Sequence, residues 1–316
     1  MLAPWLLSFA EQVFENRKNG RLHHALLFYG TKGVGKAPLS QQISAQLLCS
    51  ADLYLTPCGN CQSCTLFSAG NHPDLLIIDG AEKSIGVDEV RAITEFINKT
   101  SQLKNNKVVR IINAEKMSES AANALLKNLE EPSAKVYLIL TSSDISQLSA
   151  TITSRCTKHR INITDKANAI EWIKSQVNTA NYNVTELLAL SGDAPYKVID
   201  WAEQGRIELI YQIIEHIKHW LNGSESNEKL LTLLAQLPDG VTILMNQLSL
   251  YFYQRLTEQH NQTQELANES CYFESFSSII EQCLQFVRNE QHAVGLNHNM
   301  QLRSLLYKIE RTLCRE

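Results

Sequence analysis

The sequence predicts an α/β region built on a parallel sheet, followed by a region made only of helices. Short apolar runs typical of buried strands alternate with helical patterns over about the first 165 residues. This alternation indicates a parallel sheet that is covered on both faces. Beyond that point the strand-like runs end, and apolar residues recur at helical spacing. The length of 316 residues also exceeds what one hydrophobic core usually holds, so more than one domain is expected.

The α/β region begins with a helix from about Pro4 to Asn19. Short apolar runs that are bounded by turn signals then indicate strands. The predicted strands are Ala25–Tyr29, Leu75–Ile78, Val108–Ile112 and Val136–Leu140. A helix is expected to end near Cys49, with Pro38 in its first turn, where a missing N–H costs nothing. Two more helices are expected between the strands, near Val87 to Thr100 and Ser118 to Leu129.

The rest of the chain predicts a succession of helices separated by turn signals at Gly192, Gly205 and Gly223. The expected helices lie near Ala167–Val177, Val184–Leu190, Ala194–Gln204, Ile207–Leu221, Glu228–Leu237 and Thr242–Glu258, with more in the tail. We therefore predict three domains. They are an α/β domain over 1–165 that contains a cysteine-rich module at 49–64, a small helical domain over 166–205, and a larger helical domain over 206–316.

The composition is that of a globular chain without a strong charge. Hydrophobic residues make up 44% and charged residues 20% of the sequence, and the formal net charge is −4. The chain as a whole therefore has no electrostatic attraction for a nucleic-acid backbone. The apolar run Leu2–Ala10 is interrupted by Pro4 and has no basic start, which argues against a signal peptide. No segment reaches the roughly 18 apolar residues of a membrane span, so we expect a soluble cytoplasmic protein.

A glycine-rich segment from Gly30 to Ala37 follows the first predicted strand and opens a helix. This context is typical of a phosphate-binding loop. Gly30, Gly33 and Gly35 let backbone N–H groups curl around phosphate oxygens, while Lys36 and the helix N-terminus supply positive charge. The last position of such a loop is normally Ser or Thr, whose hydroxyl binds Mg²⁺, but here it is Ala37. A glycine-rich turn without a ligand is the alternative interpretation.

A P-loop that hydrolyses ATP also needs a carboxylate at the end of a neighbouring strand to hold the metal. Two strands compete for this role. One is followed by Asp79, and the other by Asn113 and Ala114, which can neither hold Mg²⁺ nor polarise water. Glu115 lies beyond the second strand and is expected to be a solvated turn residue. If the second strand is the correct one, hydrolysis is lost.

Four of the eight cysteines, Cys49, Cys58, Cys61 and Cys64, crowd into one short segment. Three thiolates at two-residue gaps can converge from a knuckle turn, and Cys49 can complete a tetrahedron, which suits a structural Zn²⁺ ion. An iron–sulfur cluster or a redox pair fits this spacing less well. His72 is the alternative fourth ligand. The other thiols are expected to be small core residues or surface thiols, namely Cys156, Cys271, Cys283 and Cys314.

Over about its first 200 residues the chain carries a specific series of motifs. They are Arg21-Leu22-His23-His24-Ala25, the Cys49–Cys64 segment, His72-Pro73-Asp74, Gly86-Val87-Asp88, the run Ala121 to Pro132, and Ser154-Arg155-Cys156. With these motifs the chain resembles the clamp-loader family of AAA+ proteins. The resemblance implies a RecA-like AAA+ P-loop domain with an inserted zinc knuckle over 1–165, an all-α lid over 166–205, and an all-α collar over 206–316.

The resemblance also places the metal-binding position of the second strand at Asn113 and Ala114. Because Ala37 replaces the hydroxyl as well, both protein ligands for Mg²⁺ are missing. The family's pattern of Gly with Arg three residues later appears here as Gly192 and Pro195, so that arginine is missing too. The resemblance therefore implies weak nucleotide binding or none, and no ATPase or polymerase activity of the chain by itself.

The resemblance implies a functional role for Arg155. Taken alone, an arginine in a turn indicates no more than a solvated or salt-bridged side chain. In clamp loaders the corresponding arginine reaches the ATP site of the adjacent subunit, where such a finger can raise the rate by about 10³ to 10⁵. The implied partners are the ATPase motor subunits, the delta subunit, the sliding clamp and primed DNA.

Two other functions remain open at the level of sequence. One is an active AAA+ ATPase that uses Asp79 or Glu115. The other is a zinc-dependent nucleic-acid-binding protein, although the basic stripe with interleaved aromatic residues expected of such a protein is missing.

Overall fold

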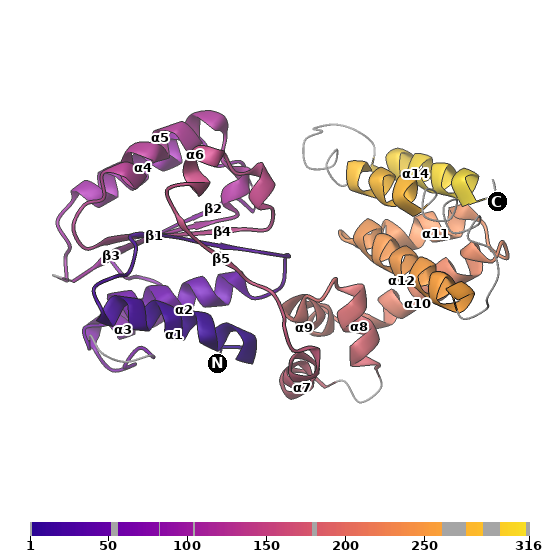
Figure 1. Cartoon of the computed structure of the whole chain (residues 1–316), viewed down its shortest axis with the longest axis horizontal. Helices are drawn as coiled ribbons and strands as arrows, with labels where there is room; N and C mark the ends of the chain where they lie inside the picture. Colours follow the sequence, from indigo (N-terminus) through magenta and orange to yellow (C-terminus); the bar gives the residue numbers. More distant parts are fainter. Residues whose placement is uncertain are drawn as a thin grey trace. The chain divides into compact units, whose positions relative to one another are not determined.

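The computed structural model describes residues 2–51, 56–81, 83–103, 105–178, 182–260, 276–286 and 298–313. The chain forms two compact units (Figure 1). The first contains Met1–Thr179 and Asp193–Lys197, and the second contains Ala180–Gly192 and Val198–Glu316. All strands that the structure describes lie in the first unit, and the second unit is built from helices.

Five parallel strands in the order β2-β3-β4-β1-β5 form the sheet of the first unit. β1 lies between β4 and β5. The connection that follows β1 leads to β2 on one side of it, whereas the connection that follows β4 leads to β5 on the other side, so the direction of the connections reverses between β1 and β4. In parallel sheets, ligands bind beyond the carboxyl ends of the strands at such a reversal. The bounds are Ala25–Tyr29 for β1, Leu75–Asp79 for β2, Lys107–Ile112 for β3, Val136–Ser142 for β4 and Thr157–Arg160 for β5.

The edge strand β5 is missing from the set of predicted strands. Of its residues Thr157, Lys158, His159 and Arg160, only His159 is buried. Backbone pairing with β1 defines this strand, and its exposed polar side chains carry no apolar run that sequence inspection can recognise. The four predicted strands are all present, at nearly the predicted bounds.

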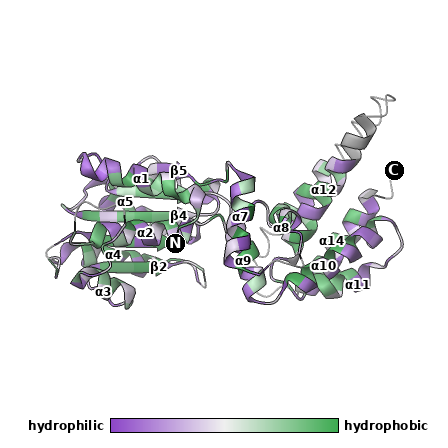
Figure 2. Ribbon diagram, turned by 90° about the horizontal axis from the view of Figure 1, so that it is seen from below, coloured by the Kyte–Doolittle hydropathy of each residue, from purple (hydrophilic) through white to green (hydrophobic). Residues whose placement is uncertain are grey.

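Helices cover both faces of the sheet (Figure 1). One face carries α1 (Pro4–Lys18), α2 (Lys36–Leu48) and α3 (Gln62–Ser68); the other carries α4 (Val87–Asn98), α5 (Glu119–Glu130) and α6 (Ala150–Thr153). The strands supply apolar side chains to both faces, and Figure 2 shows central strands such as β4 coloured as hydrophobic. Along β1, Leu26 and Phe28 join one core, while Ala25 and Leu27 join the other. The predicted doubly covered parallel sheet is confirmed.

Capping residues fix where α4 and α5 begin. The Glu89 carboxylate accepts a hydrogen bond from the backbone N–H of Gly86 at 3.0 Å, directly before α4. The Ser118 hydroxyl accepts one from the backbone N–H of Ala121 in the first turn of α5. Such caps satisfy N–H groups that have no partner within the helix. α5 begins directly after this cap and ends at Glu130.

The predicted helices of the second half are all found, with small shifts at their ends. α7 (Lys166–Gln176) belongs to the first unit, and α9 (Pro195–Glu203) begins in the first unit and continues in the second. The second unit also contains residues 276–286, α8 (Val184–Leu190), α10 (Ile207–Leu221), α11 (Asn227–Leu234), α12 (Gly240–His260) and α14 (His298–Leu313). None of the helices that the structure describes combines the length and the hydropathy needed to cross a membrane.

Candidate functional site

The glycine-rich loop connects the carboxyl end of β1 to α2 and needs its glycines. Gly30, Gly33 and Gly35 have φ angles of 150°, 86° and 107°, which residues with a side chain rarely adopt. A Cβ on Gly30 would lie 2.2 Å from the backbone oxygen of Ile161, and one on Gly35 would lie 2.7 Å from a methyl group of Leu6. The loop therefore has the position and the backbone of a phosphate-binding loop.

Lys36 turns into the loop to which it belongs. Its Nζ donates hydrogen bonds to the backbone oxygens of Gly30 at 2.6 Å and Thr31 at 2.9 Å. The side chain is buried, and burial lowers the pKa of Lys36 to about 8, although the nearby Glu115 acts in the opposite direction. The ammonium group thus bonds to loop carbonyls, where a P-loop lysine that binds nucleotide would bond to phosphate oxygens.

The first turn of α9 packs onto the same loop, a contact that the sequence analysis does not predict. The backbone N–H of Tyr196 donates to the oxygen of Gly33 at 3.0 Å. A Cβ on Gly33 would lie 2.9 Å from the Cβ of Lys197. From α1, the indole N–H of Trp5 donates to the oxygen of Val34 at 2.9 Å. These contacts hold the backbone of the loop from outside.

At the two positions predicted to bind Mg²⁺, Ala37 and Asn113 offer neither a hydroxyl nor a carboxylate. Ala37 lies in the first turn of α2. Asn113 follows β3, the strand against which α2 packs, and its amide donates to the Asp79 carboxylate at 2.8 Å. Asp79 ends β2, which lies one strand further from β1. The contact between α2 and β3 favours Asn113 over Asp79 as the position equivalent to the metal-binding carboxylate.

A buried arginine lies beside the first turn of α2. Arg110 is only 6% exposed, and its Nη2 donates to the Ser40 hydroxyl at 3.0 Å and to the Ala37 oxygen at 3.4 Å. Burial lowers the pKa of Arg110, and the Asp79 carboxylate opposes this shift. Sequence analysis places Arg110 only as one residue of a strand. A fixed cation beside Ala37 makes this end of the loop less favourable for a divalent metal ion.

Glu115 lies in the turn after β3, as predicted, but it is held there rather than free in solvent. Its carboxylate accepts hydrogen bonds from the backbone N–H of Ser143 at 3.1 Å and from the Ser143 hydroxyl. Its second oxygen, Oε2, is buried without a hydrogen-bond partner among the described residues. The prediction of a solvated Glu115 is therefore wrong.

The four clustered cysteines converge. Cys49 is the C-cap residue directly after α2, Cys61 caps the start of α3, and the four sulfur atoms all lie within 4.8 Å of one another. The Sγ atoms of Cys49 and Cys61 are 4.0 Å apart, and those of Cys58 and Cys64 are 3.9 Å apart. A tetrahedral zinc ion with Zn–S bonds of about 2.3 Å would place its ligands about 3.8 Å apart. The residues therefore fit such an ion.

His72 is not part of this thiol cluster but anchors it. Its Nδ1 accepts a hydrogen bond from the backbone N–H of Asp74 at 3.1 Å, so its Nε2 carries the proton and donates to the Ser63 hydroxyl at 2.7 Å. The Ser63 hydroxyl in turn donates to the oxygen of Leu48 at 2.6 Å. Burial lowers the pKa of His72, which favours this neutral ring. The structure therefore favours Cys49 over His72 as the fourth ligand.

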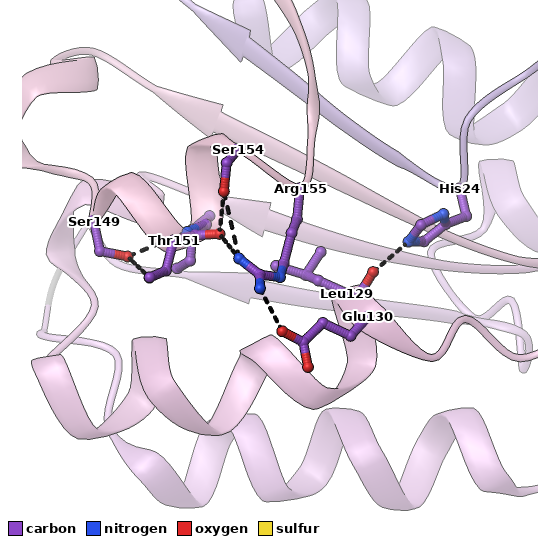
Figure 3. Close-up of polar contacts among 8 residues, drawn as sticks. His24, Leu129, Glu130, Ser149, Thr151, Ser154 and Arg155 are labelled. Atoms are coloured by element: carbon purple, nitrogen blue, oxygen red, sulfur yellow. Dashed lines mark hydrogen bonds and ion pairs between the residues drawn. The ribbon is translucent and has the colours of Figure 1, made fainter.

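Arg155 follows the short helix α6 and precedes β5 (Figure 3). Its side chain is 35% exposed and forms an ion pair with Glu130 at the end of α5, at 2.5 Å. Its Nη1 donates to the Thr151 oxygen at 3.0 Å and more weakly to the Ser154 hydroxyl at 3.4 Å. Arg155 precedes the amino end of β5, whereas the glycine-rich loop follows the carboxyl end of the parallel strand β1. Arg155 therefore lies at the amino ends of the strands, and the glycine-rich loop lies at their carboxyl ends.

The remaining thiols differ from the clustered ones. Cys156 and Cys283 are buried, and burial raises the pKa of each to about 12. Cys271 and Cys314 lie outside the residues that the structure describes. The two described thiols are core residues, as predicted.

Fold and site together define a protein with a parallel α/β sheet covered by helices and a glycine-rich loop after its first strand. Comparison with known proteins narrows this class. The family model described as "DNA polymerase III, delta subunit" matches residues 8–165. Curated relatives called DNA polymerase III subunit delta' cover a longer part of the chain. The chain therefore belongs to the DNA polymerase III delta-prime family.

Three relatives illustrate the similarity. The delta-prime subunit of Pseudomonas aeruginosa is 39% identical over 69% of this chain and 66% of its own length. That of Haemophilus influenzae is 37% identical over 66% of this chain and 63% of its own length. The match thus spans just under two thirds of these two relatives. The delta-prime subunit of Yersinia pestis is 34% identical over 74% of this chain and 70% of its own length.

Solved structures show a weaker likeness. The crystal structure of a DNA polymerase III gamma subunit-related protein from Thermotoga maritima covers 98% of this chain and 99% of its own. The TM-score is 0.48 and the sequence identity 18%, so no functional conclusion follows from this likeness.

Proposed function

We propose that this protein is a clamp-loader subunit that hydrolyses no ATP itself and acts, with motor ATPase and delta subunits, to place a sliding clamp on primed DNA. The observation that carries the proposal is the replacement of both metal-binding positions in an otherwise intact P-loop. Ala37 has no hydroxyl, and the amide of Asn113 is bonded to Asp79. Membership of the delta-prime family supports the same role.

In this proposal Arg155 completes the ATP site of a neighbouring subunit. Arg155 and the chain's own glycine-rich loop lie at opposite ends of parallel strands that rise about 3.3 Å per residue. Arg155 therefore cannot serve its own loop, and any phosphate that it contacts belongs to another molecule. Its guanidinium is partly exposed and offers a fork of N–H donors, which suits the stabilisation of charge growing on a γ-phosphate.

The cysteine module has a structural role in this proposal. Cys49, Cys58, Cys61 and Cys64 would hold one Zn²⁺ ion with all four positions filled by thiolates, which leaves no position for a catalytic water. The hydrogen bonds through Ser63 join the module to the end of α2 and to His72. The ion would thus support the α/β domain and take no part in the chemistry.

The helical remainder completes the proposed architecture. We assign residues 166–205 to a lid and 206–316 to a collar that packs with the collars of other subunits. The pattern of buried residues along α10 supports a helical domain with its own core.

The test is ATP hydrolysis by the reconstituted assembly with clamp and primed DNA, comparing this chain with its Arg155→Ala variant. We expect turnover at the composite site to fall by about 10³-fold or more, while gel filtration shows an intact complex. Lys158→Ala removes a positive charge from the exposed face of the following strand and should leave turnover unchanged. The chain alone should show no turnover. An assembly that is indifferent to Arg155 would reduce this protein to a scaffold.

One observation favours a second candidate, an ATPase that acts on its own. Glu115 is held by Ser143 near Lys36, with one carboxylate oxygen free of hydrogen bonds among the described residues. Mg²⁺-dependent turnover by the isolated chain, abolished by Lys36→Ala, would establish this function in place of the first.

A further inference from the structure

The proposed finger Arg155 already holds a carboxylate in its own chain. Its Nη2 lies 2.5 Å from Oε1 of Glu130, which belongs to α5 rather than to the turn that carries Arg155 (Figure 3). The two side chains are 35% and 49% exposed, so the pair lies at the surface where a neighbouring molecule can reach it.

Glu130 lies at a helix end, where a nearby cation stabilises its carboxylate. It is the last residue of α5, and the unpaired carbonyls at a helix C-terminus carry partial negative charge, which disfavours a second negative group. The end of this helix is also fixed from the other side, because Nε2 of His24 donates to the oxygen of Leu129 at 3.0 Å. The helix end and Glu130 together attract the Arg155 guanidinium to one place.

This arrangement engages both terminal nitrogens of the guanidinium. Nη2 is paired with Glu130, and Nη1 donates to Thr151 and Ser154. Carboxylate and phosphate oxygens are alternative partners for the same guanidinium fork. A γ-phosphate of a neighbouring subunit therefore approaches an arginine whose charge is already balanced by a carboxylate.

We infer that Glu130 is a positioning residue that competes with the neighbour's ATP for Arg155. Glu130 holds the guanidinium against α5 until the γ-phosphate takes its place. This inference rests on the proposed function of Arg155. Exposed ion pairs are weak, so the phosphate can displace Glu130, and removing the carboxylate should tighten the composite site by up to about five-fold.

The test is Glu130→Gln in the reconstituted assembly with clamp and primed DNA, with ATP varied across its half-saturating concentration. We expect that concentration to fall by about three- to five-fold, with the maximal rate unchanged. Glu131→Gln removes the same charge from the next, exposed residue and should change neither value. In an Arg155→Ala background, Glu130→Gln should have no effect, because the residue competed for is gone.

Other outcomes overturn the inference. A lower maximal rate for Glu130→Gln would mean that the carboxylate supports the finger, and an unchanged half-saturating concentration would mean that it does not compete. If Arg155→Ala alone has no effect, the proposed function fails and the inference fails with it. If Arg155→Ala is damaging and Glu130→Gln is silent, only the inference fails. Thermal unfolding of each isolated variant checks that the fold is retained.

Discussion

Among single residues, Lys36 shows most directly what burial does to a loop that has the form of a phosphate site. Its ammonium group is enclosed with two carbonyl oxygens as hydrogen-bond acceptors, and burial lowers its pKa to about 8 from the ordinary 10.5. Burial therefore makes the charged form of Lys36 less stable in the folded chain than in the unfolded chain, where the side chain is hydrated. The loop tolerates this charge because its carbonyls accept hydrogen bonds from it.

A pH-dependent stability follows from the lowered pKa of Lys36. Between pH 8 and 10.5 the unfolded chain keeps a proton on Lys36 that the folded chain has lost. The free energy of unfolding therefore increases as the pH rises through this range. Relative to Lys36→Met, the wild type should gain about 3 kcal/mol over this window, measured by urea unfolding. A flat difference across this window would show that the pKa of Lys36 is not lowered.

At the same scale, sequence reasoning identifies site residues whose chemistry lies in local spacing. The loop glycines and the four cysteines are of this kind, because each set is close together in the chain. Arg110 and Glu130 are not. Arg110 meets Ser40 across the interface of β3 with α2, and Glu130 meets Arg155 from another helix. Only the fold brings these pairs together, so no local pattern reveals either contact.

At the scale of elements, the carbonyl group of Leu48 helps to join the cysteine module to the sheet domain. The oxygen of Leu48 accepts hydrogen bonds from the Ser63 hydroxyl at 2.6 Å and from the Asn105 amide at 3.0 Å. Leu48 ends α2, the helix that begins at the glycine-rich loop. Disorder in the module would therefore loosen the far end of that helix.

We predict one zinc ion per chain and its loss on Cys61→Ser. With one of four thiolates removed the tetrahedral set is incomplete, and binding energy that stabilises the fold is lost. Metal analysis of protein purified without chelator measures the ion, and thermal unfolding measures the expected drop of several degrees in Tm. Cys283→Ala, which removes a buried thiol of the second unit, should keep the metal. A stable wild-type protein that contains no metal would refute the prediction.

Elements also differ in how well sequence predicts them. The strands β1, β3 and β4 are recovered because they are largely buried on both faces, which leaves a nearly continuous hydrophobic run. β2 is only partly buried, and it is recovered from its apolar run Leu75–Ile78. β5 is polar and depends on pairing with a strand more than a hundred residues earlier in the chain. The short helix α3 is also missed, because its residues are read as part of the knuckle turn that supplies Cys61 and Cys64.

For the whole molecule, charge decides what the chain can do alone. The formal net charge of −4 gives no general attraction for the phosphates of nucleic acid. We therefore expect the isolated chain to bind primed DNA with a Kd no tighter than about 10⁻⁶ M at physiological salt, measured by fluorescence anisotropy. The complete assembly serves as the positive control. Tight binding by the chain alone that weakens steeply with salt would instead support a nucleic-acid-binding protein.

The strand order of the sheet has a consequence for how the protein is made. β1 is the first of these five strands to leave the ribosome, yet its two neighbours are β4 and β5, the last two of the five. Until residues 136–160 are synthesised, both edges of this apolar strand lack their partners. Pairings between such distant segments form slowly, and until they form the unpaired strand edges are prone to aggregation. The four cysteines, by contrast, can come together from a short nascent segment, long before the sheet around β1 is complete.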